Sequence, residues 1–283
     1  MPKQRLDSLL VERNLCESRQ QAQRLIRAGE VRVNQQRIDK PGTEVDVAAA
    51  IEVKQKSPYV SRGGEKLTKA LQEFAIAPDN RVCLDGGIST GGFTDCLLQS
   101  GAQKVYGVDV GYGQVAWSLR QDPRVILLER TNLRHLKAPD LYASETPLAD
   151  LGVVDVSFIS LTKVLPALRE LLRSPRELVL LVKPQFEVGR DRVGKNGVVR
   201  NPTDQAMAIN QVIGAATELG WFVWGITWSP IQGPAGNIEY LLWLKDEPSI
   251  TPVMPIASLK SVDLDSLKQI AQAAQQSFKS SAE

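Results

Sequence analysis

The stretch that determines the predicted fold reads Val82-Cys83-Leu84-Asp85-Gly86-Gly87-Ile88-Ser89-Thr90-Gly91-Gly92-Phe93. It begins with an apolar run typical of a buried strand, and the residues that follow, 93–99, have the pattern of a helix. A glycine-rich turn between a strand and a helix lets the backbone approach a bound ligand closely. The amino end of the helix favours a carboxylate. We therefore expect a nucleoside cofactor to bind at this turn.

Short apolar strands alternate with helices on both sides of this turn. We expect strands at residues 105–108, 125–128, 151–156, 178–182, 221–228 and 238–245, and helices at 65–74, 115–119, 161–172 and 203–219. Such alternation predicts an α/β fold with a doubly wound, mostly parallel sheet. The last two strands have no helix between them, which indicates a closing pair. The pattern resembles the Rossmann-like fold of S-adenosylmethionine methyltransferases.

The turn lacks the G-x-G-x-x-G of nicotinamide dinucleotide sites and reads D-x-G-x-x-x-G-G, which resembles methyltransferase motif I. The resemblance implies S-adenosyl-L-methionine as the cofactor. An acid at the end of the second strand, Asp109, can accept hydrogen bonds from two ribose hydroxyls. Polar residues after the third and fourth strands lie where adenine usually sits in this fold. The predicted cofactor-binding residues are Asp85, Gly86, Gly87, Ser89, Thr90, Gly91, Gly92, Phe93, Asp109, Asn132 and Asp155.

Four charged residues form the predicted catalytic set. Lys66 opens the helix before the first strand, and Glu239 lies in the last expected strand. Asp155 and Lys183 end the fourth and fifth strands, and they should converge because the carboxyl ends of neighbouring parallel strands border one crevice. This Lys-Asp-Lys-Glu set resembles the tetrad of ribose 2′-O-methyltransferases such as the FtsJ family and the mRNA cap enzymes.

The chain as a whole resembles the TlyA family, sometimes labelled hemolysin-like, over residues 3–245. The resemblance lies in five blocks of sequence, at residues 59–64, 85–93, 155–161, 183–187 and 236–241. It implies 2′-O-methylation of cytidine in ribosomal RNA. The implied partner is ribosomal RNA or a ribosomal subunit.

The chemistry requires a ribose hydroxyl to lose its proton as it attacks the methyl group. A base at the site typically accelerates such a step by about 10²–10⁴-fold. An ordinary lysine, with a pKa of about 10.4, is protonated at neutral pH, so a lysine base needs burial and a neighbouring cation. We therefore predict Lys183 as the general base, with Lys66 as the neighbouring cation. In the alternative mechanism, Lys183 stays charged and stabilises the developing alkoxide.

The N-terminal segment has its own pattern of two short helices and a small sheet. Ser18 is a suitable N-cap for a helix over residues 19–28, and Gly29 suits the position after it. Strands are expected at 31–33 and 45–53. The segment resembles the alpha-L RNA-binding motif of a small-subunit ribosomal protein. Basic residues here, in the linker that follows and in a loop after Lys183 are the predicted RNA-binding residues: Arg5, Arg19, Arg24, Arg27, Arg62, Arg190, Arg192 and Lys195.

These patterns predict four parts of the chain. Residues 1–57 form the RNA-binding domain, 58–64 a linker, 65–246 the methyltransferase domain and 247–283 a C-terminal extension. The extension contains three prolines in a flexible tether, followed by an amphipathic helix over 264–278. Residues 1–64 include 12 basic and 8 acidic residues, which suits a module that meets phosphate.

Composition excludes several classes of protein. Three cysteines without a CxxC pair and a single histidine, His135, argue against a disulfide framework and against any metal site. The sequence has neither a signal-like start nor an apolar stretch long enough to span a bilayer, so we expect a cytoplasmic protein without a membrane partner. The oligomeric state stays open, a monomer included.

Three alternative functions remain. A pseudouridine synthase would need an Arg-Leu-Asp block within its catalytic domain, but the only such block is Arg5-Leu6-Asp7 in the N-terminal module. A membrane-active, hemolysin-like protein is suggested by the family label alone. A non-catalytic RNA-binding or ribosome-assembly factor would keep the fold but would not need to bind S-adenosylmethionine.

Overall fold

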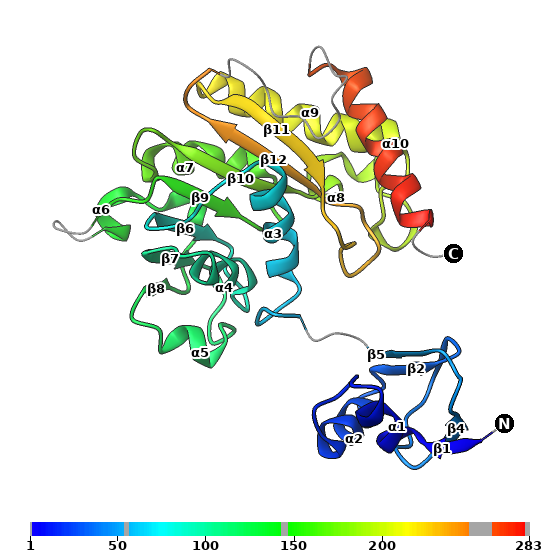
Figure 1. Cartoon of the computed structure of the whole chain (residues 1–283). Coiled ribbons are helices and arrows are strands. Elements are labelled where there is room, and N and C mark those ends of the chain that lie inside the picture. The colour runs from blue at the N-terminus through cyan, green and yellow to red at the C-terminus, as the bar shows by residue number, and fades with distance from the viewer. Residues whose placement is uncertain (1, 54–56, 143–146, 249–261, 281–283) are drawn as a thin grey trace. The chain divides into compact units, whose positions relative to one another are not determined.

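The structure is a computed structural model that describes residues 2–53, 57–142, 147–248 and 262–280. The chain divides into two compact units, Met1–Lys56 and Ser57–Glu283. Figure 1 shows their secondary structure, coloured from the N-terminus to the C-terminus. Each unit has its own hydrophobic core and is described separately below.

The N-terminal unit packs two helices against two small antiparallel sheets. Its elements are β1 (Lys3–Arg5), α1 (Leu6–Glu12), α2 (Arg19–Arg27), β2 (Val31–Val33), β3 (Gln36–Arg37), β4 (Glu44–Asp46) and β5 (Ile51–Val53). β1 pairs with β4, and β2 lies between β3 and β5. The expected N-cap of α2 is confirmed, because Ser18 Oγ accepts a hydrogen bond from the Gln21 backbone N–H at 3.3 Å.

The expected strand at 45–53 is wrong, because the chain turns between β4 and β5. Asp46 causes the break: its Oδ1 accepts the Ala48 N–H at 2.8 Å, and its carbonyl oxygen accepts the Ala49 N–H at 2.9 Å. An aspartate that bonds the backbone two residues on competes with strand pairing. The short strands β1 and β3 also lacked a sequence signal.

The second unit contains the predicted doubly wound sheet, and the predicted fold class is confirmed. Its strands are β6 (Val82–Gly86), β7 (Lys104–Val108), β8 (Val125–Leu128), β9 (Leu151–Val154), β10 (Glu177–Val182), β11 (Phe222–Trp228) and β12 (Tyr240–Lys245). They lie in the order β11-β12-β10-β9-β6-β7-β8. β12 runs antiparallel to both of its neighbours, while the pairs from β10 to β8 are parallel.

Helices cover both faces of this sheet (Figure 1). They are α3 (Gly63–Glu73), α4 (Gly92–Gln99), α5 (Trp117–Arg120), α6 (Ala138–Leu141), α7 (Leu165–Leu171), α8 (Pro184–Glu187), α9 (Pro202–Glu218) and α10 (Leu264–Ser280). Successive strand residues point to opposite faces. Cys83 therefore packs with α3 and α4, whereas Leu84 packs with α7 and α9. α10, the helix expected in the C-terminal extension, packs against α9.

Several boundaries differ from the sequence prediction. The expected helix at 161–172 is two pieces, a 3₁₀ turn at Leu161–Lys163 and α7, because Pro166 starts a new helix near its N-terminus. α3 begins at Gly63 instead of residue 65, and β12 begins at Tyr240, so Glu239 precedes the last strand instead of lying in it. Most of the expected tether, residues 249–261, lies outside the described residues.

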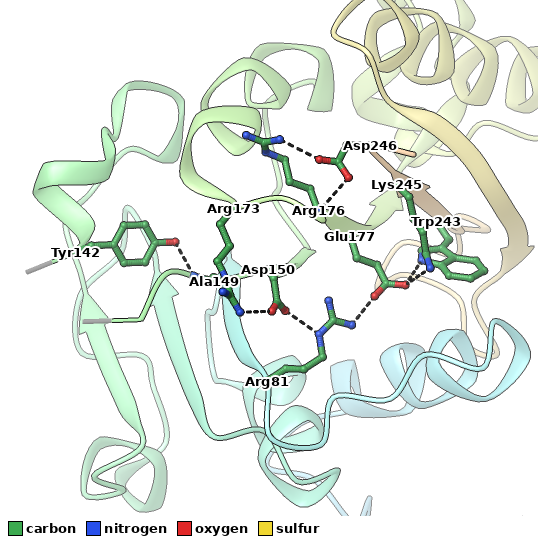
Figure 2. Close-up of polar contacts among 10 residues, drawn as sticks. All are labelled: Arg81, Tyr142, Ala149, Asp150, Arg173, Arg176, Glu177, Trp243, Lys245 and Asp246. Carbon is green, nitrogen blue, oxygen red and sulfur yellow. Dashed lines mark hydrogen bonds and ion pairs between the residues drawn. The ribbon is translucent and has the colours of Figure 1, made fainter. Parts of the chain in front are cut away.

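A network of charged side chains joins the amino ends of the parallel strands (Figure 2). We call Arg81, Asp150, Glu177 and Lys245 the amino-edge network. Arg81 donates to Asp150 Oδ1 at 2.7 Å and also to Glu177, whose other oxygen lies 3.4 Å from Lys245 Nζ. These four residues precede β6 and β9, begin β10 and end β12, so one network ties four strands together. It lines a cavity of about 360 Å³.

Candidate active site

The candidate site lies where the strand order reverses. In the sheet, β7 lies on one side of β6 and β9 lies on the other. A crevice therefore forms beyond the carboxyl ends of β6 and β9. The glycine-rich turn follows β6. Gly87 has φ +86°, and a Cβ there would lie 2.5 Å from the carbonyl oxygen of Asp155. Only glycine fits this position, which leaves the backbone bare beside the crevice.

The crevice holds a pocket of about 310 Å³. All four predicted catalytic residues line it, together with several residues of the glycine-rich turn: Lys66, Gly87, Ser89, Thr90, Gly92, Phe93, Asp155, Lys183 and Glu239. Its size and its mixture of polar side chains with bare backbone are typical of small-molecule sites. The pocket residues therefore suit a cofactor that lies along the turn and ends at the charged cluster.

Ion pairs connect the four charged residues, which we call the catalytic cluster after their predicted role. Lys183 Nζ lies 2.6 Å from Asp155 Oδ1, and Lys66 Nζ lies 3.9 Å from the other oxygen, Asp155 Oδ2. Lys66 Nζ also donates to Glu239 Oε2 at 2.6 Å. Lys66, Lys183 and Glu239 are buried, with at most 8% of each residue exposed. Two lysines thus face two carboxylates at the pocket, and Asp155 is the most exposed of the four, with 22% of its side chain accessible.

Strand polarity explains how these residues meet. Val182 of β10 pairs with Tyr240 of β12 in the antiparallel register. Lys183 directly follows β10 and Glu239 directly precedes β12, so both lie at the carboxyl edge of the parallel strands. Lys66 comes from the first turns of α3, on the face of the sheet that α3 covers.

Two known protein families match the two units of the chain. The model of the FtsJ-like methyltransferase family matches residues 59–246, and that of the S4 domain matches residues 4–51. The chain belongs to the FtsJ-like methyltransferase family. It is therefore a methyltransferase with S-adenosyl-L-methionine as its methyl donor, which confirms the predicted enzyme class and cofactor. The N-terminal unit of this FtsJ-like methyltransferase is an S4 domain, the type of module that the alpha-L resemblance implied.

Relatives of this FtsJ-like methyltransferase cover most of its length. The 16S/23S rRNA (cytidine-2′-O)-methyltransferase TlyA of Mycobacterium tuberculosis is 51% identical over 86% of this chain and 90% of its own. Hemolysin A of Brachyspira hyodysenteriae is 43% identical over 84% of this chain and 98% of its own. A solved structure from Streptococcus thermophilus, provisionally named a hemolysin, has a TM-score of 0.74 and 41% identity, and the match covers 100% of this chain and 99% of that one. No described helix is long and apolar enough to cross a membrane.

Some of the predicted cofactor-binding residues do not line the pocket of the methyltransferase. Asp85 is fully buried below the turn, where its Oδ2 accepts the Thr94 hydroxyl at 2.6 Å and burial raises its pKa to about 7. Gly86 and Gly91 lie behind the pocket wall: a Cβ on Gly86 would lie 2.7 Å from the Leu133 side chain. We infer that these residues support the turn.

Two further predicted residues bond to nearby backbone. Asp109 Oδ2 accepts the Ser89 N–H at 2.8 Å, and its Oδ1 accepts the Gly111 N–H at 2.7 Å, so the carboxylate connects the glycine-rich turn to the chain after β7. Asn132 is exposed and accepts the Arg134 N–H at 3.0 Å, where it caps a 3₁₀ turn. Their binding to ribose and adenine stays a prediction.

One pocket residue, Ser157, was not predicted from the sequence. Its Oγ accepts a hydrogen bond from Lys183 Nζ at 2.8 Å, and it lines the pocket. The available signal was its position two residues after Asp155, just past the end of β9. Lys183 thus has two oxygen partners that fix its amine in space, one carboxylate and one hydroxyl.

The predicted RNA-binding arginines fall into two groups. Arg5 and Arg19 bind the buried carboxylate of Asp7, with nitrogen–oxygen distances of 2.9 and 3.1 Å, although about half of each side chain stays exposed. Arg24 and Arg27 are exposed on α2 and have no acidic partner among the described residues. The latter pair is free to contact phosphate.

The basic residues of the second unit are also exposed. Arg62 precedes α3 and lines the pocket of the methyltransferase. Arg190 and Lys195 lie in two 3₁₀ turns after α8, and Arg192 between them pairs with Asp204 at 2.8 Å. Contact of any of these residues with RNA stays a prediction.

Proposed function

We propose that this methyltransferase transfers the methyl group of S-adenosyl-L-methionine to the ribose 2′-hydroxyl of a cytidine in ribosomal RNA. The observation that carries the proposal is the meeting of Lys183 and Asp155, 2.6 Å apart, in a pocket that they share with the glycine-rich turn. The name of the 51% identical relative, an rRNA (cytidine-2′-O)-methyltransferase, supports this substrate. The S4 domain supports an RNA partner.

The turn residues Gly87, Ser89 and Thr90 would hold the cofactor, which supplies an electrophilic methyl group at a sulfonium. Transfer of this methyl group to the ribose oxygen would require the hydroxyl proton to leave. Lys183 Nζ is the group at the pocket that takes the proton or, if it stays charged, stabilises the alkoxide. Asp155 and Ser157 orient its amine. The ion pair between Lys66 and Glu239, which has no net charge, lies beside them. Fixed orientation of this kind lowers the barrier further.

RNA capture in this proposal belongs to the N-terminal unit and chemistry to the second unit. The exposed Arg24 and Arg27 of α2 would contact phosphate, while Arg62 would contact RNA at the pocket entrance. Such contacts make affinity fall steeply with salt. Because ribosomal subunits are the proposed substrate, we place the enzyme in the cytoplasm.

The test uses purified enzyme, radiolabelled S-adenosylmethionine and unmodified 30S and 50S subunits in separate reactions. We expect label in ribosomal RNA at a cytidine whose 3′ bond resists alkaline hydrolysis, as 2′-O-methylation requires. Wild-type protein that labels neither subunit and shows no binding of S-adenosylmethionine by calorimetry would instead indicate the non-catalytic assembly factor. Dye release from lipid vesicles by the pure protein would indicate the membrane-active alternative.

A further inference from the structure

Glu187, the last residue of α8, binds the loop that follows β9. Its Oε2 accepts the Ser160 hydroxyl at 2.6 Å, and its Oε1 accepts the Leu161 N–H at 2.8 Å. The carboxylate is 5% exposed, and no ion pair joins it to a lysine or arginine among the described residues. One side chain after β10 therefore holds the segment after β9, and these are the two segments that carry Lys183 and Asp155.

A buried carboxylate without a counter-ion is costly for a fold. Its desolvation is only partly offset by two hydrogen bonds, and burial accordingly raises the pKa of Glu187. Stability alone would favour an apolar or amide side chain at such a place. Costly polar groups are often retained where they serve a site.

The loop between Asp155 and Ser160 needs such an anchor. Phe158 has φ +64°, a left-handed conformation that is strained for a bulky residue, and 92% of it is exposed, so burial does not offset the strain. The loop is held on one side by the bond from Lys183 Nζ to Ser157 Oγ and on the other by Glu187. Without the second anchor, the loop can relax and withdraw Ser157 from Lys183.

We propose that Glu187 is a positioning residue for methyl transfer, because it fixes the loop that presents Ser157 Oγ to Lys183 Nζ. The inference rests on the proposed function, since it assigns Lys183 the reacting role. Displacement of a catalytic group by about 1 Å can reduce a rate by about 10²-fold. Loss of the anchor should therefore reduce kcat and leave substrate binding nearly unchanged.

The experiment compares three variants in the subunit methylation assay. Glu187→Ala should lower kcat by about 10–100-fold, whereas KM for the subunit and the Kd for S-adenosylmethionine stay within about threefold. Glu187→Gln should recover most of kcat, because its amide accepts from Leu161 N–H and donates to Ser160 Oγ. The matched control, Glu177→Ala, removes another buried glutamate from the other end of β10 and should keep kcat within about twofold.

A double-mutant cycle with Ser157→Ala tests the route of the effect. Ser157→Ala should lower kcat, and adding Glu187→Ala should cause little further loss, because both act through one contact. Multiplicative losses, or normal kcat in Glu187→Ala, would overturn the proposal. If Glu187→Ala does not fold, Ser160→Ala removes one of the two bonds and must lower kcat, by less than loss of both bonds would, while KM and Kd stay within about threefold. A wild-type enzyme without transfer activity would refute the proposed function itself.

Discussion

The two ends of one sheet carry similar charges but differ in what those charges can do. The catalytic cluster at the carboxyl edge has two lysines and two acids, and the amino-edge network has an arginine, a lysine and two acids. Each borders a cavity of similar size, about 310 and 360 Å³. Charge and concavity alone therefore do not distinguish a catalytic site from a structural network.

Two features separate these regions. At the amino edge, Arg81 bonds two carboxylates at once and cannot lose its proton at any working pH, while Glu177 also accepts the Trp243 indole N–H at 2.8 Å (Figure 2). At the carboxyl edge, both cations are lysines and bare glycine backbone lies beside them, whereas the lysine of the amino-edge network, Lys245, shares Glu177 with Arg81. Two exchangeable cations beside open backbone are the features that suit this end of the sheet to the proposed reaction.

The largest expected effect comes from Lys183 in the catalytic cluster. Lys183→Ala should reduce methyl transfer by about 10²–10⁴-fold while cofactor binding, measured by calorimetry, stays intact. Lys183→Arg keeps a charge that cannot accept a proton, so partial activity would favour alkoxide stabilisation and full loss would favour the base. Near-normal turnover by Lys183→Ala would exclude this residue from the chemistry.

A second prediction concerns the amino edge. Glu177→Ala leaves Arg81 and Lys245 without their shared carboxylate and should lower the free energy of unfolding by about 3 kcal/mol, measured by urea denaturation. Turnover at a temperature where the variant is folded should match the wild type. A large loss of turnover with little loss of stability would show that the two ends of the sheet are not separate in function.

The third prediction is a pH dependence that originates at Asp85. Burial raises its pKa to about 7, whereas the unfolded chain has the ordinary value of 3.8, so the native state retains a proton that the unfolded state loses between these values. The stability of the cofactor-free protein should therefore fall as pH rises from about 4 to 7. Each kcal/mol of stability that is lost should lower the melting temperature by roughly 2–4 °C.

Asp85→Asn is the matched variant for this test, because the amide keeps the shape of the side chain without the titration. Its melting temperature should change less than that of the wild type between pH 5 and pH 7. The same pH dependence in both proteins would assign the effect to another group.

The smallest effect is expected on α2, where Arg19 pairs with Asp7 but Arg24 and Arg27 have no acidic partner among the described residues. Arg24→Ala and Arg27→Ala should each weaken binding to ribosomal subunits a few-fold, reduce the slope of log affinity against log salt by about 1, and leave the melting temperature unchanged. Arg19→Ala should in addition lower the melting temperature, because it removes a partner of the buried Asp7. An unchanged salt slope in the first two variants would place the RNA elsewhere.

Much of the fold and part of the site could be predicted from the sequence. Alternating apolar strands and helices gave the parallel sheet, and parallel strands end at a shared edge, so the meeting of Asp155 and Lys183 followed from topology. The position of Glu239 did not, because it depends on the antiparallel direction and register of β12. The pairing of Arg5 and Arg19 with Asp7 was also hidden, since no local pattern indicates that this acid is buried.

The register between β10 and β12 has a consequence for how this enzyme can change over evolution. A slip of one residue would replace Glu239 with a neighbour at the pocket and would turn each side chain of β12 to the opposite core. A mutation that moves the acid by a register slip would therefore also disrupt the packing of β12 on both faces of the sheet. The packed interior thus fixes the place of residue 239 at the pocket, whatever side chain stands there.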